Sequence, residues 1–539
     1  LVGSEMCIRD RVTPRWWNDI WLNESFASWM DNKTSHIYWP EGEFNRETLK
    51  GALSAMDGDS LIAARQIREP VERNEDISTA FDGITYQKGG GVLAMLERYV
   101  GEERFRDGVR LHMARFADGV ATAEDFIESV AEGSERPEIG VAFKSFIEQP
   151  GVPLLSVSLK CESGQPPRLE VGQTRYTPLG SSIDGSASTW QVPMCVSMMS
   201  GGERISSCTL VSEKQQSVPL AVDGCPTVVH PNADGAGYYR FALDEPSWRK
   251  LIENAGDLPA AEALTMLDSL DAAFRSGDVS ADIFVAGMAA LINHDTWDVA
   301  SAVTTALSGI EDIVPATQHE PLHRAFRDLA GPRFARLADE TDPRSTLLRR
   351  RLQRFLIITA QDPDLRAPLA VKAAARIGLD GDPDPTAVPP EQLETVLTVG
   401  VQDLGEPFFG LLMEQALASG NPAFRNAAIG ALGRVQEPAL AKKLQNAVAE
   451  GRFKGTEFVG ILFRQMSDPA TVDFTFEWLK QNDELISKVP ETFRGAFAPA
   501  LGSFFCTSDR AKEWRDFIEA RADVLPGYER RLAQTLESI

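Results

Sequence analysis

A tryptophan-rich segment at residues 16–29, WWNDIWLNESFASW, surrounds a carboxylate with bulky side chains. At helical spacing, four apolar side chains form one stripe along this segment: Leu22, Phe26, Trp29 and Met30. Trp17 and Trp21 fall on the opposite side, in line with Glu24. Because a buried carboxylate costs several kcal/mol unless it is paired or bound to a metal ion, the pattern leaves two hypotheses. Glu24 is either a metal ligand or half of an ion pair with an arginine in the core.

A second segment, FDGITYQKGGGVLAML at residues 81–96, places a tyrosine just before three consecutive glycines. Each glycine in a helix costs about 1 kcal/mol relative to alanine, so a compensating gain is expected. We expect that gain to be close packing of the backbone at Gly89, Gly90 and Gly91. Taken by itself, Tyr86 is more typical of a half-buried core tyrosine than of a catalytic residue.

Together, the two segments resemble the aminopeptidase N family of zinc gluzincins. WWNDIWLNESFASW is similar to the stretch that supplies the third zinc ligand of an H-E-x-x-H-x18-E site, which implies this role for Glu24. The second segment resembles the family's tyrosine motif, which implies that Tyr86 donates a hydrogen bond to the oxyanion of the tetrahedral intermediate. The resemblance implies one zinc ion as cofactor and peptides as substrates, cleaved at the N-terminal residue.

The other parts of the zinc motif are absent at the positions where the spacing requires them. Counting back from Glu24, the motif needs histidine at positions 1 and 5 and glutamate at position 2, but the chain has Leu1, Val2 and Glu5. One carboxylate cannot hold zinc at useful affinity. Residues 1–11, LVGSEMCIRDR, fit nothing in the family and resemble a non-native, adapter-derived leader. We therefore expect a gene truncated within the motif and an inactive chain.

A literal H-E-x-x-H motif occurs far downstream, from His319 to His323, with Asp342 at the spacing of a third ligand. Pro321 lies inside this motif and is tolerated only in the first turn of a helix, so His319 falls at or before the cap. No tyrosine motif follows. The segment therefore predicts a helix start with two surface histidines.

The hydrophobic pattern divides the chain into three regions. Residues 12–150 show helical spacing, for example over 17–36, 46–66, 92–100 and 102–116, and the resemblance makes this region part of a thermolysin-like catalytic domain. Residues 151–245 alternate as strands, with strand-type aromatics at Tyr238, Tyr239 and Phe241, and predict a small β-sandwich. Residues 246–539 show helix pairs at intervals of roughly forty residues and predict a HEAT-like α-superhelical array. The predicted fold is therefore multidomain and mainly α.

Four of the six cysteines fall within the sandwich region: Cys161, Cys195, Cys208 and Cys225. They could form two disulfides or stay as four unpaired thiols, and the pairing cannot be read from the sequence. Disulfides would favour a periplasmic or secreted protein. A cytoplasmic protein is the alternative.

Composition excludes several classes of function. The 539 residues carry 78 acidic and 54 basic side chains, a formal charge of −24, which repels nucleic acid. No apolar run approaches the ~18 residues of a membrane-spanning helix. The second hypothesis for function is a non-catalytic scaffold whose helical array binds peptides or a partner protein. The oligomeric state and the preferred N-terminal residue are not encoded in any motif that we identify.

Overall fold

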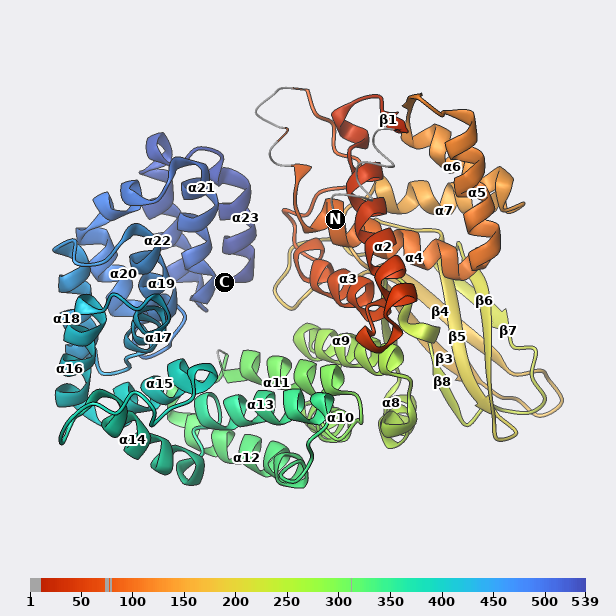
Figure 1. Ribbon diagram of the computed structural model, residues 1–539. Helices are drawn as coiled ribbons and strands as arrows, with labels where there is room; N and C mark the ends of the chain where they lie inside the picture. Colours follow the sequence, from red (N-terminus) through yellow and green to blue (C-terminus); the bar gives the residue numbers. More distant parts are fainter. Residues whose placement is uncertain (1–10, 73–76, 78–79, 312) are drawn as a thin grey trace. The chain divides into compact units, whose positions relative to one another are not determined.

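The computed structural model describes residues 11–72, 77, 80–311 and 313–539, which form two compact units (Figure 1). The first unit runs to Val299 and the second from Ala300 to Ile539. Position 11 excepted, the predicted leader and the positions where the zinc motif requires histidine lie outside the described residues. The division into three domains at residues 150 and 245 stays a prediction.

The α-rich part of the first unit contains a two-stranded parallel sheet and most of the helices that the sequence predicts. The sheet pairs β1 (Val12–Pro14) with β2 (Gly119–Ala121). The helices are α2 (Trp21–Tyr38), α3 (Asn45–Asp59), α4 (Gly89–Val100), α5 (Glu102–Arg115), α6 (Ala123–Gly133) and α7 (Glu138–Ile147).

Helix α2 begins later than the sequence pattern predicts. Trp17–Asp19 form a separate 3-10 turn, so Trp17 does not share a helix with Glu24 and the predicted alignment of the two is wrong. The cause is Asp19, whose side chain is buried. Its carboxylate accepts hydrogen bonds from Arg68 Nε (2.8 Å) and from the backbone N–H of Ala123 (3.1 Å). These tertiary contacts hold the turn in its own conformation.

The predicted sandwich consists of two sheets. The first has the strand order β7–β4–β3–β9, and the second has the order β6–β5–β8. Their bounds are β3 (Pro153–Lys160), β4 (Arg168–Arg175), β5 (Val192–Ser200), β6 (Glu203–Val211), β7 (Gln215–Pro219), β8 (Val228–His230) and β9 (Arg240–Leu243). Phe241 lies in β9 as predicted. Tyr238 and Tyr239 lie in the turn before it, both buried, so their prediction as strand residues is wrong.

One hydrophobic core joins the α-rich part to the sandwich. It contains Trp21 and Phe143 from the helices, whose ring centroids lie 5.7 Å apart, and Leu155 and Trp190 from the sandwich side, which are fully buried. Three helices follow the sheets within the first unit: α8 (Glu245–Glu253), α9 (Ala260–Ser276) and α10 (Ala281–Leu291). Helix α11 (Trp297–Glu311) begins in the first unit and continues into the second.

The described residues of the second unit form helices and no strands. These are α12 (His319–Arg336), α13 (Pro343–Ile358), α14 (Pro363–Ile377), α15 (Leu393–Asp403), α16 (Gly405–Ala418), α17 (Pro422–Leu432), α18 (Pro438–Ala449), α19 (Gly455–Met466), α20 (Val472–Gln481), α21 (Glu491–Ala500), α22 (Ser508–Glu519) and α23 (Tyr528–Ser538). Near neighbours in sequence pack on one another, α12 on α13 and α14 on α15, as a helical stack requires. Several begin at an Asp-Pro or Asn-Pro step whose side chain caps the helix, at Asp342, Asp362 and Asn421.

Across the part of the chain that the structure describes, no helix combines the length and the apolar character needed to cross a bilayer.

The four sandwich cysteines form two disulfides in the structure, Cys161–Cys225 and Cys195–Cys208. Cys195 and Cys208 lie directly opposite each other on β5 and β6. We expect mass spectrometry of a non-reduced digest to recover these two crosslinks, each lost on treatment with dithiothreitol. Because the Cys161–Cys225 bond closes a loop with a sequence separation of 64 residues, reduction should lower the stability of the sandwich by about 2–4 kcal/mol. Four thiols that alkylate without reductant would contradict the pairing.

Candidate active site

The two residues that the resemblance singles out lie on neighbouring elements of the first unit. Glu24 is in the first turn of α2 and is half-buried, not fully buried as the sequence pattern predicts. Tyr86, also half-buried, is in the middle of a π-helical turn, η4 (Ile84–Lys88), which leads directly into α4. A π-helical turn is uncommon and occurs frequently at functional sites.

A hydrogen bond between their immediate neighbours fixes α2 against this turn. Ser25 Oγ donates to the Thr85 carbonyl at 2.5 Å, and both residues are almost completely buried. Each candidate residue is therefore directly adjacent in sequence to a residue of the contact that joins the two elements. The structure brings Glu24 and Tyr86 to adjoining backbone segments, although their roles as ligand and oxyanion donor stay predictions.

The three glycines after Tyr86 allow this close approach. A Cβ atom added to Gly89 would lie 1.9 Å from Ser25 Oγ, and one added to Gly91 would lie 2.7 Å from Ala52 Cβ on α3. Both distances are shorter than any real contact. The close packing that the sequence predicts is therefore confirmed at Gly89 and Gly91, whereas a Cβ atom at Gly90 would lie 3.7 Å from its nearest neighbour, an ordinary contact.

A buried arginine holds the start of the π-helical turn. Arg65 donates to Asp82 Oδ1 (2.7 Å) and to Thr85 Oγ1 (2.6 Å), and its side chain is almost fully buried. Asp82 Oδ1 in turn accepts the backbone N–H of Ile84 at 3.0 Å. Charge-assisted bonds of this kind fix the backbone more strongly than neutral ones.

A buried lysine holds the other end of the turn. Lys88 Nζ lies 2.8 Å from Asp59 Oδ2, and both side chains are fully buried. Asp59 also accepts the Tyr238 hydroxyl (3.1 Å) and the backbone N–H of Gly151 (2.8 Å). Burial lowers the pKa of Lys88, against the opposing effect of Asp59, and burial raises the pKa of Tyr238. These contacts tie the turn to α3 and to both ends of the sandwich.

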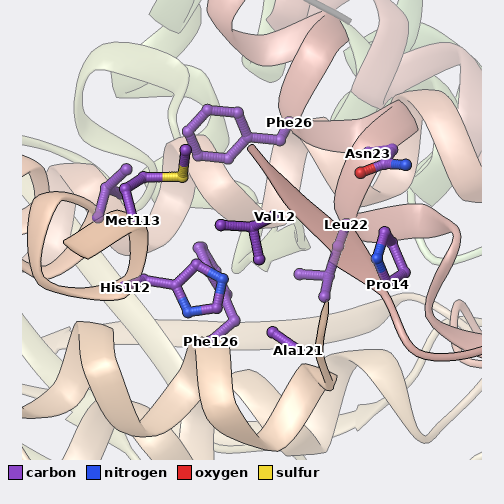
Figure 2. Close-up of a pocket in the computed structure, with 10 residues that line it drawn as sticks. Val12, Pro14, Leu22, Asn23, Phe26, His112, Met113, Ala121 and Phe126 are labelled. Atoms are coloured by element: carbon purple, nitrogen blue, oxygen red, sulfur yellow. The ribbon is translucent and has the colours of Figure 1, made fainter. Parts of the chain in front are cut away.

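A small cavity lies on another side of α2, lined by Leu22, Phe26, His112 and Phe126 among others (Figure 2). Its volume of about 30 Å³ has room for a water molecule. The lining is almost entirely apolar and includes neither Glu24 nor Tyr86. Burial lowers the pKa of His112, which favours the neutral imidazole in these apolar surroundings. The cavity brings together no set of groups for catalysis.

The residues around Glu24 do not complete a zinc site. A catalytic zinc of the gluzincin type needs three protein ligands and one open position. Within the described residues, the one group of three or more potential ligands close enough to share an ion is Glu311, His319 and His323, in the second unit. Glu24 thus offers one ligand of the three, and no catalytic step through zinc can be built from this chain's described residues.

The downstream histidine motif differs from its prediction in one respect. Helix α12 begins at His319 with Pro321 in its first turn, as predicted. His323 is not on the surface, however. It is buried and hydrogen-bonded to Glu311, the last residue of α11. Asp342 does not act as a third ligand. It is exposed and caps α13 by accepting hydrogen bonds from the backbone N–H groups of Arg344 and Ser345.

Sequence reasoning missed the residues that position the candidate site. Nothing in the local pattern points to Arg65, Asp59 or Tyr238, since each meets the π-helical turn from a distant part of the chain. One available signal was Lys88, a charged residue at the start of a buried helix that must find a partner.

Two family models match the chain. The peptidase family M1 domain matches residues 8–149, and the ERAP1-like C-terminal domain matches residues 228–539. The first match contains both Glu24 and Tyr86. The second covers more than half of the chain.

Curated relatives match along most of the chain. Aminopeptidase 2, mitochondrial, of Saccharomyces cerevisiae is 24% identical over 98% of this chain and 55% of its own length. Tricorn protease-interacting factor F2 of Thermoplasma volcanium is 24% identical over 90% of this chain and 57% of its own length. Puromycin-sensitive aminopeptidase of Caenorhabditis elegans is 28% identical over 55% of this chain and 31% of its own length. The chain spans about half the length of the relatives that match most of it.

Proposed function

Because this chain belongs to the aminopeptidase N family of zinc gluzincins, with an M1 peptidase domain followed by an ERAP1-like C-terminal domain, we propose that the protein removes N-terminal residues from peptides. The reaction is hydrolysis of the first peptide bond and depends on a zinc ion. The substrates are peptides with a free N-terminus.

We assign two residues of this chain to that reaction. Glu24 is one of the protein ligands of the zinc ion, and Tyr86 donates a hydrogen bond to the oxyanion that forms from the scissile carbonyl. A neutral phenol in this place stabilises charge that develops only in the transition state, so it raises the rate without tightening substrate binding. The observation that carries this proposal is the buried hydrogen bond from Ser25 to Thr85, which fixes the neighbours of both residues together.

The other residues of the site hold Tyr86 in position. Arg65 and Lys88 hold the two ends of its π-helical turn by buried, charge-assisted contacts. A phenol on a loose turn would lose most of its effect, because an oxyanion donor must lie within hydrogen-bond distance of the place where the charge develops. We therefore propose that both ion pairs preorganise the oxyanion donor.

We also propose that the protein works outside the cytoplasm, in the periplasm or as a secreted enzyme. The two disulfides of the sandwich support this location, since such bonds form and persist in oxidising compartments.

Zinc content and hydrolysis of leucyl- and alanyl-anilides test the proposed activity. Zinc content and anilide hydrolysis are measured on three proteins. These are this chain, a variant carrying Leu1→His, Val2→Glu and Glu5→His, and a full-length protein with an intact motif. We expect the full-length protein to hold a zinc ion at the catalytic motif and to cleave both anilides. The unmodified chain should cleave neither, because Glu24 alone cannot retain the ion.

Two other outcomes would change the assignment. Anilide hydrolysis by the unmodified chain would place the catalytic metal away from Glu24. A full-length protein without activity would instead favour the scaffold that binds peptides or a partner protein through its helical array.

A further inference from the structure

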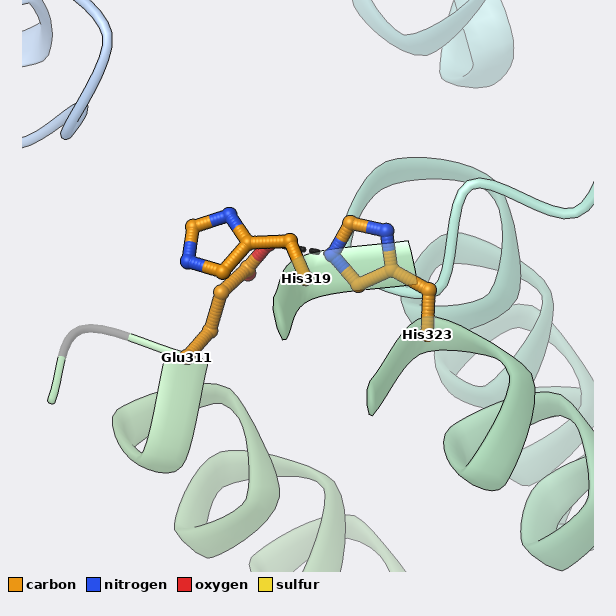
Figure 3. Close-up of side chains that lie close together, drawn as sticks. All are labelled: Glu311, His319 and His323. Atoms are coloured by element: carbon orange, nitrogen blue, oxygen red, sulfur yellow. Dashed lines mark hydrogen bonds and ion pairs between the residues drawn. The ribbon is translucent and has the colours of Figure 1, made fainter. Parts of the chain in front are cut away.

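Three side chains that commonly bind metals meet between the end of α11 and the first two turns of α12 (Figure 3). His319 and His323 are four residues apart on α12 and therefore lie on the same face of the helix, with ring centroids 5.8 Å apart. Glu311, the last residue of α11, faces them from the other helix. We call these residues the α11–α12 cluster.

The distances in the α11–α12 cluster are close to those of a metal site. Glu311 Oε1 lies 2.6 Å from His323 Nε2, and one ligand atom from each of the three residues lies within 4.8 Å of the others. Ligand atoms of a tetrahedral zinc ion are about 3.3 Å apart, as follows from bond lengths of about 2.0–2.1 Å. Binding an ion would require the side chains to rotate until the three ligand atoms reach that spacing, and the two helices already place the residues together.

The hydrogen bond of His319 prepares it to act as a ligand. Its Nε2 lies 2.9 Å from the carbonyl oxygen of Val314. A carbonyl can only accept, so Nε2 carries the proton and the lone pair of the neutral ring is on Nδ1. Histidines that bind metals usually donate their other ring N–H to a carbonyl or a carboxylate in this way.

Two of the three side chains of the cluster are partly exposed, so an ion can reach them from solvent, and the cluster is buried enough to hold it. The His323 side chain is 5% exposed and that of Glu311 is 23% exposed, while His319 is half-buried. His323 Nε2 and Glu311 Oε1 share a hydrogen bond, in which a carboxylate can only accept, and an ion would take the place of the shared proton between the same two groups. One carboxylate and two neutral imidazoles form a ligand set that zinc accepts.

The glutamate of the motif does not take part. Glu320 is exposed and bonded to Arg327 at 2.9 Å, so it does not face the cluster as the general base of a peptidase would. The cluster therefore has the ligands of a metal site without the remaining parts of a hydrolytic one.

We propose that Glu311, His319 and His323 bind one divalent transition-metal ion, zinc or a metal with the same ligand preference. The ion joins the end of α11 to the start of α12 and stabilises the beginning of the second unit. This site is separate from the zinc of the proposed activity and does not depend on that activity.

Titration of the metal-stripped chain tests the proposal. Zn²⁺ is followed by calorimetry, and Co²⁺ is followed by the visible absorption that a tetrahedral nitrogen and oxygen ligand set produces. We expect one equivalent to bind with a tetrahedral cobalt spectrum and to raise the melting temperature. His319→Ala should weaken binding about tenfold or more and reduce the rise in melting temperature at the same metal concentration. Since His319 is half-buried, this variant should melt like the parent chain when no metal is present.

Two matched variants distinguish this site from metal binding elsewhere in the chain. Asp342→Asn removes the residue at the motif's third-ligand spacing, and Glu24→Gln removes the candidate catalytic ligand; both should leave the bound equivalent unchanged. His323→Gln should weaken binding as His319→Ala does. Absence of binding to the stripped chain, binding that survives His319→Ala, or binding that disappears in Glu24→Gln would each overturn the proposal. None of these results depends on the aminopeptidase activity.

Discussion

Replacing Asp59 with alanine is expected to destabilise the first unit by about 3–5 kcal/mol. The substitution leaves the Lys88 ammonium without its partner in a place where neither side chain has any exposure to water. It also removes the acceptor for the Tyr238 hydroxyl and for the backbone N–H of Gly151. Denaturant unfolding measures the loss, with tryptophan fluorescence as the signal because Trp21 and Trp190 are buried in the same core.

A double-mutant cycle and a surface control test whether the loss of stability comes from the buried ion pair. Asp59→Ala combined with Lys88→Met should cost less than Asp59→Ala alone, since the unpaired buried charge is then gone. Asp107→Ala breaks the exposed pair with Arg110 and should change stability by no more than about 1 kcal/mol. Equal losses for Asp59→Ala and Asp107→Ala would show that the buried pair has no special role.

Tyr86→Phe in a full-length protein with an intact zinc motif is expected to lower kcat about 10²–10³-fold, with little change in KM. The variant removes only the hydroxyl, so the loss reflects one hydrogen bond to the oxyanion, about 2.7–4 kcal/mol of transition-state stabilisation. Anilide hydrolysis under steady-state conditions gives both constants. Zinc content should stay at the parent value, which separates this residue from a ligand.

Two further variants complete that experiment. Tyr38→Phe changes a tyrosine that is 93% exposed and should leave kcat unchanged. Glu24→Gln should instead lose the catalytic zinc ion and the activity together, as expected of a ligand. A kcat for Tyr86→Phe within a factor of about three of the parent value would remove Tyr86 from the mechanism.

The elements that carry the candidate site follow from local patterns in the sequence. The apolar spacing along residues 17–36 predicts a helix, and α2 occupies most of that range. The cost of three glycines predicts close packing after Tyr86, and Ser25 and Ala52 are the neighbours that need the space. These inferences succeed because helix periodicity and glycine's missing side chain act within a few residues of the chain.

Contacts between distant segments could not be predicted in the same way. His323 looks like a surface residue because the sequence does not reveal that Glu311 would meet it from the preceding helix. Trp17 fits a helical repeat, yet Asp19 holds its turn apart through contacts with Arg68 and Ala123. In each case a polar side chain found its partner through tertiary structure, which spacing along the chain does not encode.

The network at Asp59 also limits how this protein can be recombined with its relatives. The residues of this network lie at positions 59, 88, 149–151 and 238. The sandwich, which lies between positions 151 and 238, therefore helps to support Tyr86 although it contains no residue of the proposed catalytic site. A chimera that imports a foreign sandwich would separate Asp59 and Lys88 from Tyr238 and from the backbone groups that they contact in this chain. The sandwich is therefore not an interchangeable module, and crossovers that keep residues 59 to 238 from one parent should yield the more soluble hybrids.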